Sequence, residues 1–450
     1  MFFTREKSFY KRLMVLFTTI AIQNFLAYSV NMADNVMLGS FRQDVLSGAT
    51  TVNQIFFMIQ MLGSALGETM VMIGSQYWGK KQLSPIRRIS GLGLKVTAVS
   101  AVIVFALCAV IPRQMIMLFT KDAAIIEQGM IYLRILKYSF VLFLISQCLM
   151  AALRTVETVK ISSVISLVSL IVNVGLNWIL IFGHFGAPRL GITGAAIGTL
   201  IARAVELIIL IVYVLKIDNK LHLFSENIFR KDKELSADFR RQLIPMVLTD
   251  MLWAVSVPMQ TAILGHLSSD AIAANSVAST FYNYLKVLIR AMVSASAVLM
   301  GSAIGRGDME EVKREARTLA VADVILGAIL GILLFVLRTP LLGFYNLTPE
   351  AIRLADQMII LMSVVMVFMS YQMPVQGGII RASGDTKFNM YNNLLSVWCV
   401  VIPLSLLSAF VWHWPVIWVV LMVQSDQIFK CVPVFIRFRG YKWIRKLTRD

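Results

Sequence analysis

Charged residues and long hydrophilic segments are scarce in this chain. Only 15% of its 450 residues are charged, a composition that excludes an ordinary soluble enzyme of this size. Cysteine is also rare, and Cys108, Cys148, Cys399 and Cys431 all fall in apolar segments without paired spacing. The sequence therefore predicts neither a disulfide framework nor a cysteine metal site. A phosphate-binding loop and metal-spaced carboxylates are missing as well, so the sequence does not indicate a nucleotide-driven machine.

Apolar segments fill the chain instead. Hydrophobic residues make up 58% of the sequence and the mean hydropathy is +0.75. Because about 20 apolar residues in a helix cross a bilayer, we predict an all-α polytopic membrane protein. Its twelve expected transmembrane helices are approximately 13–38, 50–76, 91–112, 125–152, 161–183, 194–215, 243–264, 271–304, 318–337, 350–380, 389–411 and 416–436.

The net charge is +17, and its Lys and Arg residues are divided unequally between the two sets of loops that flank the apolar segments. Of the 42 Lys and Arg residues, 29 fall on the N-terminal side of the first segment and in the loops that share it. Six fall in the opposite loops and seven within the segments. This asymmetry predicts that both termini are cytoplasmic. The charge is then explained by topology and by contact with anionic membrane lipid, and nucleic acid is not an expected partner.

An internal repeat suggests two halves. The longest hydrophilic stretch, 216–241, lies between the sixth and seventh segments. A shift of 226 residues superposes NMADNVMLGSFRQD (31–44) on VPMQTAILGHLSSD (257–270). We therefore expect an N-terminal lobe at 1–215, a basic cytoplasmic connector at 216–242 and a C-terminal lobe at 243–450. Six segments separate equivalent points, so the lobes should be related by a pseudo-twofold axis along the membrane normal, as in many transporters.

The first apolar run carries a polar stripe that ends in a carboxyl group. Asn24, Tyr28, Asn31 and Asp34 recur at spacings of three and four, so they share one helix face. A carboxylate in a membrane helix costs about 2.5–3.5 kcal/mol on insertion scales, and a cation, a proton or a basic partner must offset that cost. Asp34 is therefore either a coupling or binding residue, or a cap or ion-pair partner at the helix end.

Other ionisable residues within the segments have two interpretations each. Glu68 is either a second proton carrier or a partner of Arg134, Lys137 or Arg203. Arg203 and Glu206 stand three residues apart on one segment, a spacing that favours an ion pair over a relay.

The seventh and eighth segments carry a further polar group. Lys286 and Arg290 either neutralise Asp250 or contact an anionic substrate. Gln260, in the segment that aligns with Asp34, is a further candidate cavity residue.

Four stretches resemble the multidrug and toxic compound extrusion (MATE) family of antiporters. They are MADNVMLGSF (32–41), the paired loops GSQYWGKKQ (74–82) and GSAIGRGDMEEVKR (301–314), the run from ALRTVETVK to GITGAAIGT (152–199), and RFRGYKW (437–443). The resemblance spans nearly the whole chain. It implies two six-helix lobes that alternate between inward- and outward-facing states.

The resemblance also implies a cation site. In members whose site lies in the N-terminal lobe, residues matching Asp34, Asn173 and Asn177 line it. Many members have Asp where Asn177 stands, which weakens the expectation of tight sodium binding here. In the branch that uses the C-terminal lobe, acidic residues occur on helices 7 and 10, and that site is incomplete in this sequence.

The resulting expectation is a secondary efflux antiporter, not an enzyme. It would export amphipathic organic compounds in exchange for H⁺ or Na⁺, bound at Asp34, Asn173 and Asn177, without another cofactor. We expect a monomer in the plasma or inner membrane. The alternatives are a flippase for lipid-linked precursors, suggested by Lys286 and Arg290, and a membrane-embedded enzyme or receptor.

Overall fold

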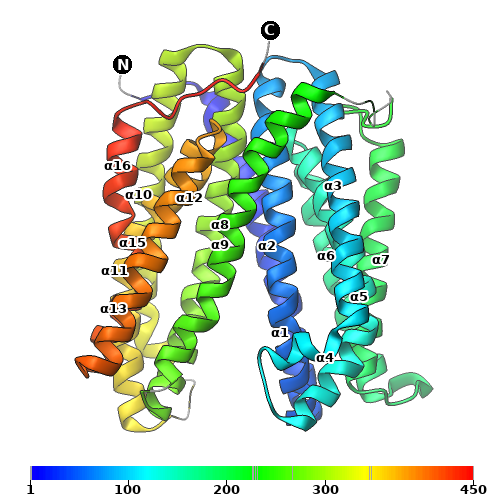
Figure 1. Cartoon of the computed structure of the whole chain (residues 1–450), viewed down its shortest axis with the longest axis vertical. Helices are drawn as coiled ribbons and strands as arrows, with labels where there is room; N and C mark the ends of the chain where they lie inside the picture. The colour runs from blue at the N-terminus through cyan, green and yellow to red at the C-terminus, as the bar shows by residue number, and fades with distance from the viewer. Residues whose placement is uncertain are drawn as a thin grey trace. The chain divides into compact units, whose positions relative to one another are not determined.

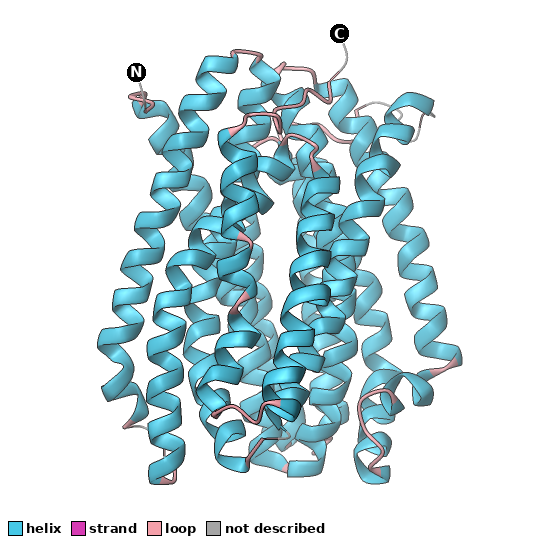
Figure 2. Cartoon of the chain, turned by 60° about the vertical axis from the view of Figure 1, so that its left-hand side comes forward, coloured by secondary structure: helices cyan, strands magenta, loops and turns pink. Residues whose placement is uncertain are grey.

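The structure, a computed structural model, describes residues 3–225, 228, 230, 232–265, 267–343, 345 and 347–448. All regular secondary structure in these ranges is helical (Figure 2). Twelve helices of the described chain are long and apolar enough to cross a membrane. The expected all-α membrane fold is thereby confirmed.

The chain divides into two compact units, and the first comprises Ile22–Leu243. Helix α1 (Lys7–Phe41) enters it partway along its length. The helices that follow are α2 (Gln43–Gly79), α3 (Leu83–Val110), α4 (Pro112–Met117), α5 (Ala123–Thr155), α6 (Lys160–Phe182) and α7 (Ile192–Lys216), with a 3₁₀ turn η1 (His184–Gly186) after α6. Helix α5 packs against α2, α3 and α7 (Figure 1).

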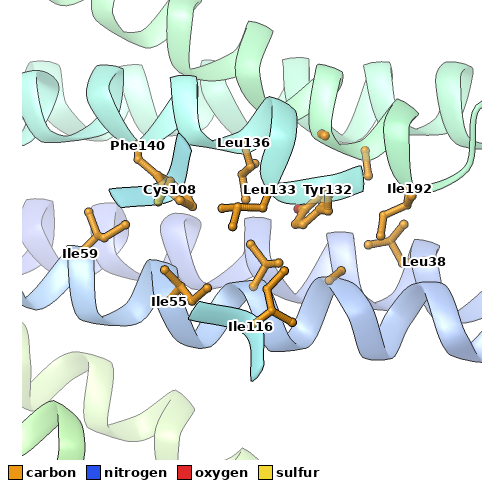
Figure 3. Close-up of a cluster of buried hydrophobic side chains, with 14 of the residues drawn as sticks. Leu38, Ile55, Ile59, Cys108, Ile116, Tyr132, Leu133, Leu136, Phe140 and Ile192 are labelled. Atoms are coloured by element: carbon orange, nitrogen blue, oxygen red, sulfur yellow. The ribbon is translucent and has the colours of Figure 1, made fainter. Parts of the chain in front are cut away.

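The core of this first unit lies around α5. Leu133, Leu136 and Phe140 of α5 are fully buried against Ile55 and Ile59 of α2 (Figure 3). Toward one end of the same cluster, Tyr132 lies close to Leu38 of α1 and Ile192 of α7 (Figure 3). This end of the core is where α1, α5 and α7 meet, and it positions the polar residues described below.

The second unit comprises Met1–Ala21 and Ile244–Asp450. Its helices are the first part of α1, most of α8 (Lys233–Gly265), α9 (Ser269–Arg306), α10 (Met309–Leu342), α11 (Pro349–Pro374), α12 (Thr386–Leu394), α13 (Ile402–Leu406), α14 (Val416–Gln424), α15 (Asp426–Phe429) and α16 (Cys431–Arg439), with π-helical η2 (Val375–Ile380), η3 (Leu395–Val401) and η4 (Leu407–Val411). The N-terminal segment, from Thr4 into the first turns of α1, is hydrogen bonded to α9 and α10 of this unit. The Thr4 amide donates to Thr318 Oγ1 at 3.1 Å, and Arg12 donates to Ser302 Oγ at 3.3 Å.

Helix α8 begins inside the segment that we predicted as the connector. We predicted a hydrophilic segment at 216–242, but α7 ends at Lys216 and α8 already begins at Lys233. The stretch KELSADFRRQ is polar, yet Glu, Leu, Lys and Arg are good helix formers, so the helix continues beyond its apolar part. Of the remaining connector, residues 226, 227, 229 and 231 lie outside the described part of the chain.

Candidate functional site

The structure brings Asp34, Asn173 and Asn177 together inside the first unit. Asn177 donates from Nδ2 to Asp34 Oδ1 at 2.5 Å and approaches Asn173 Oδ1 at 3.3 Å. All three side chains are buried, with exposures of 6% for Asp34, 1% for Asn173 and 0% for Asn177. Thus α1 supplies a carboxyl group and α6 supplies two amides, which face it from successive turns.

Helix α6 presents its amides through a regular polar face. Its buried polar residues are Ser162, Ser169, Asn173 and Asn177, and the last three are four apart, a spacing that aligns side chains on one side of a helix. Helix α7 approaches closely because Gly198 has no side chain: a Cβ there would collide with the Asn177 amide. The small residue therefore leaves the space that the amide occupies.

Helix α7 completes the cluster with Thr199, Arg203 and Glu206. Asn173 donates from Nδ2 to Thr199 Oγ1 at 3.2 Å. Arg203 Nη1 donates to Glu206 Oε2 at 2.7 Å, and Ser169 Oγ lies 3.4 Å from the same oxygen. Arg203 and Glu206 thus form the i,i+3 ion pair that their spacing indicated. Arg203 also interacts electrostatically with Asp34.

Thr199 and Tyr132 were missed by reasoning from the sequence. Tyr132 of α5 is buried and its hydroxyl interacts with the Thr199 side chain. Thr199 carried a usable signal, because it stands four residues before Arg203 on the face that also holds Glu206. Tyr132 carried none, since a tyrosine in an apolar helix is ordinarily a core residue.

One oxygen of the cluster has no hydrogen-bond donor. Asn177 Oδ1 is buried and has no partner among the described residues. Buried polar atoms are nearly always hydrogen bonded, so this oxygen, which faces Gly198 of α7, is an exception within the cluster. Carboxylate, amide and hydroxyl oxygens are ligands suited to hard cations, and a carboxylate also binds a proton.

Glu68 is paired with a cation that we did not anticipate. Arg154 Nη2 lies 3.2 Å from Glu68 Oε1, whereas the sequence suggested Arg134, Lys137 or Arg203. The apolar segment ends near residue 152, which placed Arg154 in a loop. Helix α5 continues to Thr155 and carries the guanidinium to α2.

Two basic residues of the second unit, Lys286 and Arg290, lie close to the indole ring of Trp253. The Trp253 ring centroid of α8 lies 5.7 Å from Lys286 Nζ and 5.5 Å from Arg290 Cζ. Arg290 interacts electrostatically with Asp250, and Lys286 interacts with Asp426.

Tyr282 and Gln260 lie on the same two helices, α9 and α8, as this cluster. Tyr282 contributes a second ring 5.9 Å from Lys286 Nζ. Gln260 lies farther along α8 than Trp253.

Comparison with known proteins places the chain in a family. The MatE family model matches residues 19–179 and again 245–407, an offset of 226 residues between the two starts. The uncharacterized transporter YisQ of Bacillus subtilis (strain 168) is 23% identical over 95% of this chain and 93% of its own. The probable multidrug resistance protein NorM of Rhizobium meliloti (strain 1021) is 24% identical over 86% of this chain and 83% of its own.

Solved structures share the fold at low sequence identity. A mutant of the Vibrio cholerae MATE transporter VcmN has a TM-score of 0.88 at 16% identity and covers 97% of this chain and 98% of its own. A MOP superfamily transporter from Pyrococcus furiosus, titled for the reverse polarity of its binding pocket, has a TM-score of 0.86 at 14% identity, with coverages of 96% and 95%. The family match covers most of the sequence, and the chain is a multi-pass membrane transporter that belongs to the MatE family.

Proposed function

We propose that this protein is a secondary active efflux antiporter that exports amphipathic organic compounds in exchange for protons or sodium ions. The observation that carries the proposal is the enclosed Asp34 carboxyl, which accepts a hydrogen bond from the Asn177 amide and lies in the same cluster as Asn173. Multidrug resistance proteins among the relatives support the export of organic compounds.

The chemistry follows from the poor solvation of this carboxyl. In the buried cluster an ionised Asp34 is stabilised by the Asn177 amide and by Arg203. A proton, or a cation held by Asp34, Asn173 and Asn177, removes the cost of the remaining charge. If one transport state binds that ion more tightly than the other, the ion gradient shifts the equilibrium between them.

We also propose how the chain is placed in the cell. It lies in the plasma or inner membrane as a monomer, with both termini cytoplasmic and its basic loops against anionic lipid. The division of Lys and Arg between the two sets of loops supports this orientation. We propose functional lobes of 1–215 and 243–450 joined by the basic connector, with Met1–Ala21 packed in the second unit.

The test is substrate efflux from proteoliposomes containing the Asp34→Asn variant. With ethidium as the amphipathic probe, separate proton and sodium gradients identify the coupling ion. Typical coupling free energies of about 1–3 kcal/mol predict a loss of gradient-driven efflux of about 5- to 150-fold. Asp44→Asn is the matched control, because that partly exposed carboxylate pairs with Arg42 outside the cluster. Full efflux by a normally inserted Asp34→Asn protein would refute the proposal.

The Trp253 cluster favours a second candidate, a flippase for lipid-linked precursors. Lys286 has no acidic group within 4.0 Å among the described residues, so its charge remains available to an anion, and the indole beneath it suits an apolar chain. A pyrophosphate headgroup on a lipid combines these two chemistries.

This second candidate is separated from drug efflux by binding. Lys286→Gln should weaken binding of a pyrophosphate lipid in mixed micelles by about 10-fold, the cost of losing about 1.4 kcal/mol. Lys137→Gln is the control, because Lys137 lies over the rings of Phe105 and Tyr138 in the other unit. Equal binding by wild type and Lys286→Gln would remove the flippase from consideration.

A further inference from the structure

A carboxyl group in the middle of α10 is buried and accepts no hydrogen bond from the part of the chain that the structure describes. Asp323 is 0% exposed, and neither of its carboxyl oxygens has a hydrogen-bond donor among the described residues. Its neighbours in sequence, Val321, Ala322, Val324 and Ile325, are apolar. Buried carboxylates normally have a donor or a cation beside them. Asp323 therefore requires a separate explanation from the ion pairs elsewhere in the chain.

Close packing of α10 against α11 encloses the group. Ser370 Oγ of α11 donates to the main-chain oxygen of Asp323 at 2.6 Å, so it does not satisfy the carboxyl. One turn farther along α10, a Cβ on Gly327 would collide with Ser370. The two helices are thus in direct contact beside Asp323, and this contact excludes water from the carboxyl.

The surroundings supply no counter-charge. The helices packed against α10 are α11, α9 and η2. Tyr371 of α11 interacts electrostatically with Asp323 and with Cys431 of α16, and its buried hydroxyl also has no hydrogen-bond partner. Apart from Tyr371, no ionisable side chain among the described residues interacts electrostatically with the Asp323 carboxyl.

The charge of this carboxyl follows from these surroundings. An unpaired ionised carboxylate costs several kcal/mol or more away from water, whereas a protonated carboxyl is neutral. A metal cation would need several oxygen ligands, and the Tyr371 hydroxyl alone does not supply them. Asp34 differs, because Asn177 donates a hydrogen bond to it.

We propose that Asp323 is a second proton-binding site, which holds its proton in this conformation and releases it when the α10–α11 contact opens to water. On release, the carboxyl O–H bond breaks, the electron pair stays on the oxygen and water accepts the proton. The site lies in the unit formed by Met1–Ala21 and Ile244–Asp450, and Asp34 lies in the other unit. The release step rests on the proposed antiport cycle, which supplies the second conformation, in which the α10–α11 contact is open to water. The bound proton does not depend on Asp34.

Infrared spectroscopy tests the bound proton without transport. In lipid vesicles at neutral pH, the wild-type spectrum minus that of Asp323→Asn should contain the carbonyl stretch of a protonated carboxyl group. The same subtraction with Asp356→Asn should not contain it, because that carboxylate of α11 is partly exposed and paired with Arg338 at 3.1 Å. Ionised carboxylate bands in the Asp323→Asn difference would overturn the proposal. If Asp323→Asn does not insert, Asp323→Ser provides the same subtraction.

Proton counting then tests the release. In proteoliposomes transporting ethidium, Asp323→Asn should exchange about one proton fewer per transported molecule than wild type, since one carboxyl binds one proton. Asp34→Asn, assayed in parallel, reports separately on the proposed coupling site. An unchanged proton count and pH profile in Asp323→Asn would show that the carboxyl is only structural, whatever Asp34→Asn does.

Discussion

Asp34 and Asp323 are two carboxyl groups buried in different ways. Asp34 receives an amide hydrogen bond from Asn177 and the field of Arg203, so its anion is partly stabilised. Asp323 has neither among the described residues, which is the basis for proposing that it holds a proton. The burial of both is similar, and what separates them is the presence of a donor. At this scale the neighbours of a residue, more than its type, decide its chemistry.

The Glu68–Arg154 pair is suited to a double-mutant test. Removing one partner of a buried pair typically costs about 3–5 kcal/mol because the other charge is left alone. We expect Glu68→Gln to lower the thermal midpoint of the purified protein, and Glu68→Gln/Arg154→Gln to recover much of the loss. A relay would behave differently. It would leave the midpoint of Glu68→Gln near wild type and shift the pH profile of transport.

The contact between α6 and α7 decides the geometry of the Asp34 cluster. Gly194 and Gly198 of α7 face the α6 backbone and the Asn177 side chain, where a Cβ would collide. Small residues at such spacing allow membrane helices to approach closely. The same contact lets Asn173 reach Thr199 across the interface at 3.2 Å. The close contact between α6 and α7 therefore determines the geometry of the Asp34 cluster as much as its polar residues do.

Gly198→Ala tests this contact. The added methyl must displace the Asn177 amide, and overpacking of this kind typically costs about 1–3 kcal/mol. We expect reduced thermal stability together with weakened gradient-driven efflux. Gly175→Ala on α6 is the matched control, because a Cβ there meets nothing within 4 Å. Equal loss in both variants would point to a general effect of alanine and not to the site.

At the scale of the whole molecule, both halves of the chain match the same family model but carry different polar residues. The matches at 19–179 and 245–407 cover corresponding parts of the two halves. The first unit holds Asp34 with two asparagines, while the second holds Lys286, Arg290 and the isolated Asp323. The two halves share one family pattern, and different polar residues within it give each unit its own charge.

The proposed orientation predicts which loops face the cytoplasm. In a background without Cys399 and Cys431, which are exposed and half-buried, single cysteines can report the side of each loop. Phe185→Cys, at a position 86% exposed, should react with a membrane-impermeant thiol reagent in intact cells. Phe224→Cys in the connector should react only after the membrane is permeabilised. The opposite pattern would reverse the proposed topology.

The sequence by itself determined the membrane class and the twelve helices and indicated the repeat, whereas the grouping of Asp34 with Asn173 and Asn177 was implied by the family resemblance. It could do so because hydrophobic length and helical periodicity are local properties of a chain. The tertiary structure alone decided the partners: Arg154 for Glu68, Tyr132 and Thr199 for the cluster, and no donor for Asp323. These depend on which helix faces pack together, and on helices that continue past their apolar segments, as α5 and α8 do. A carboxyl group in an apolar run looks the same in sequence whether a donor, a cation or nothing lies opposite it.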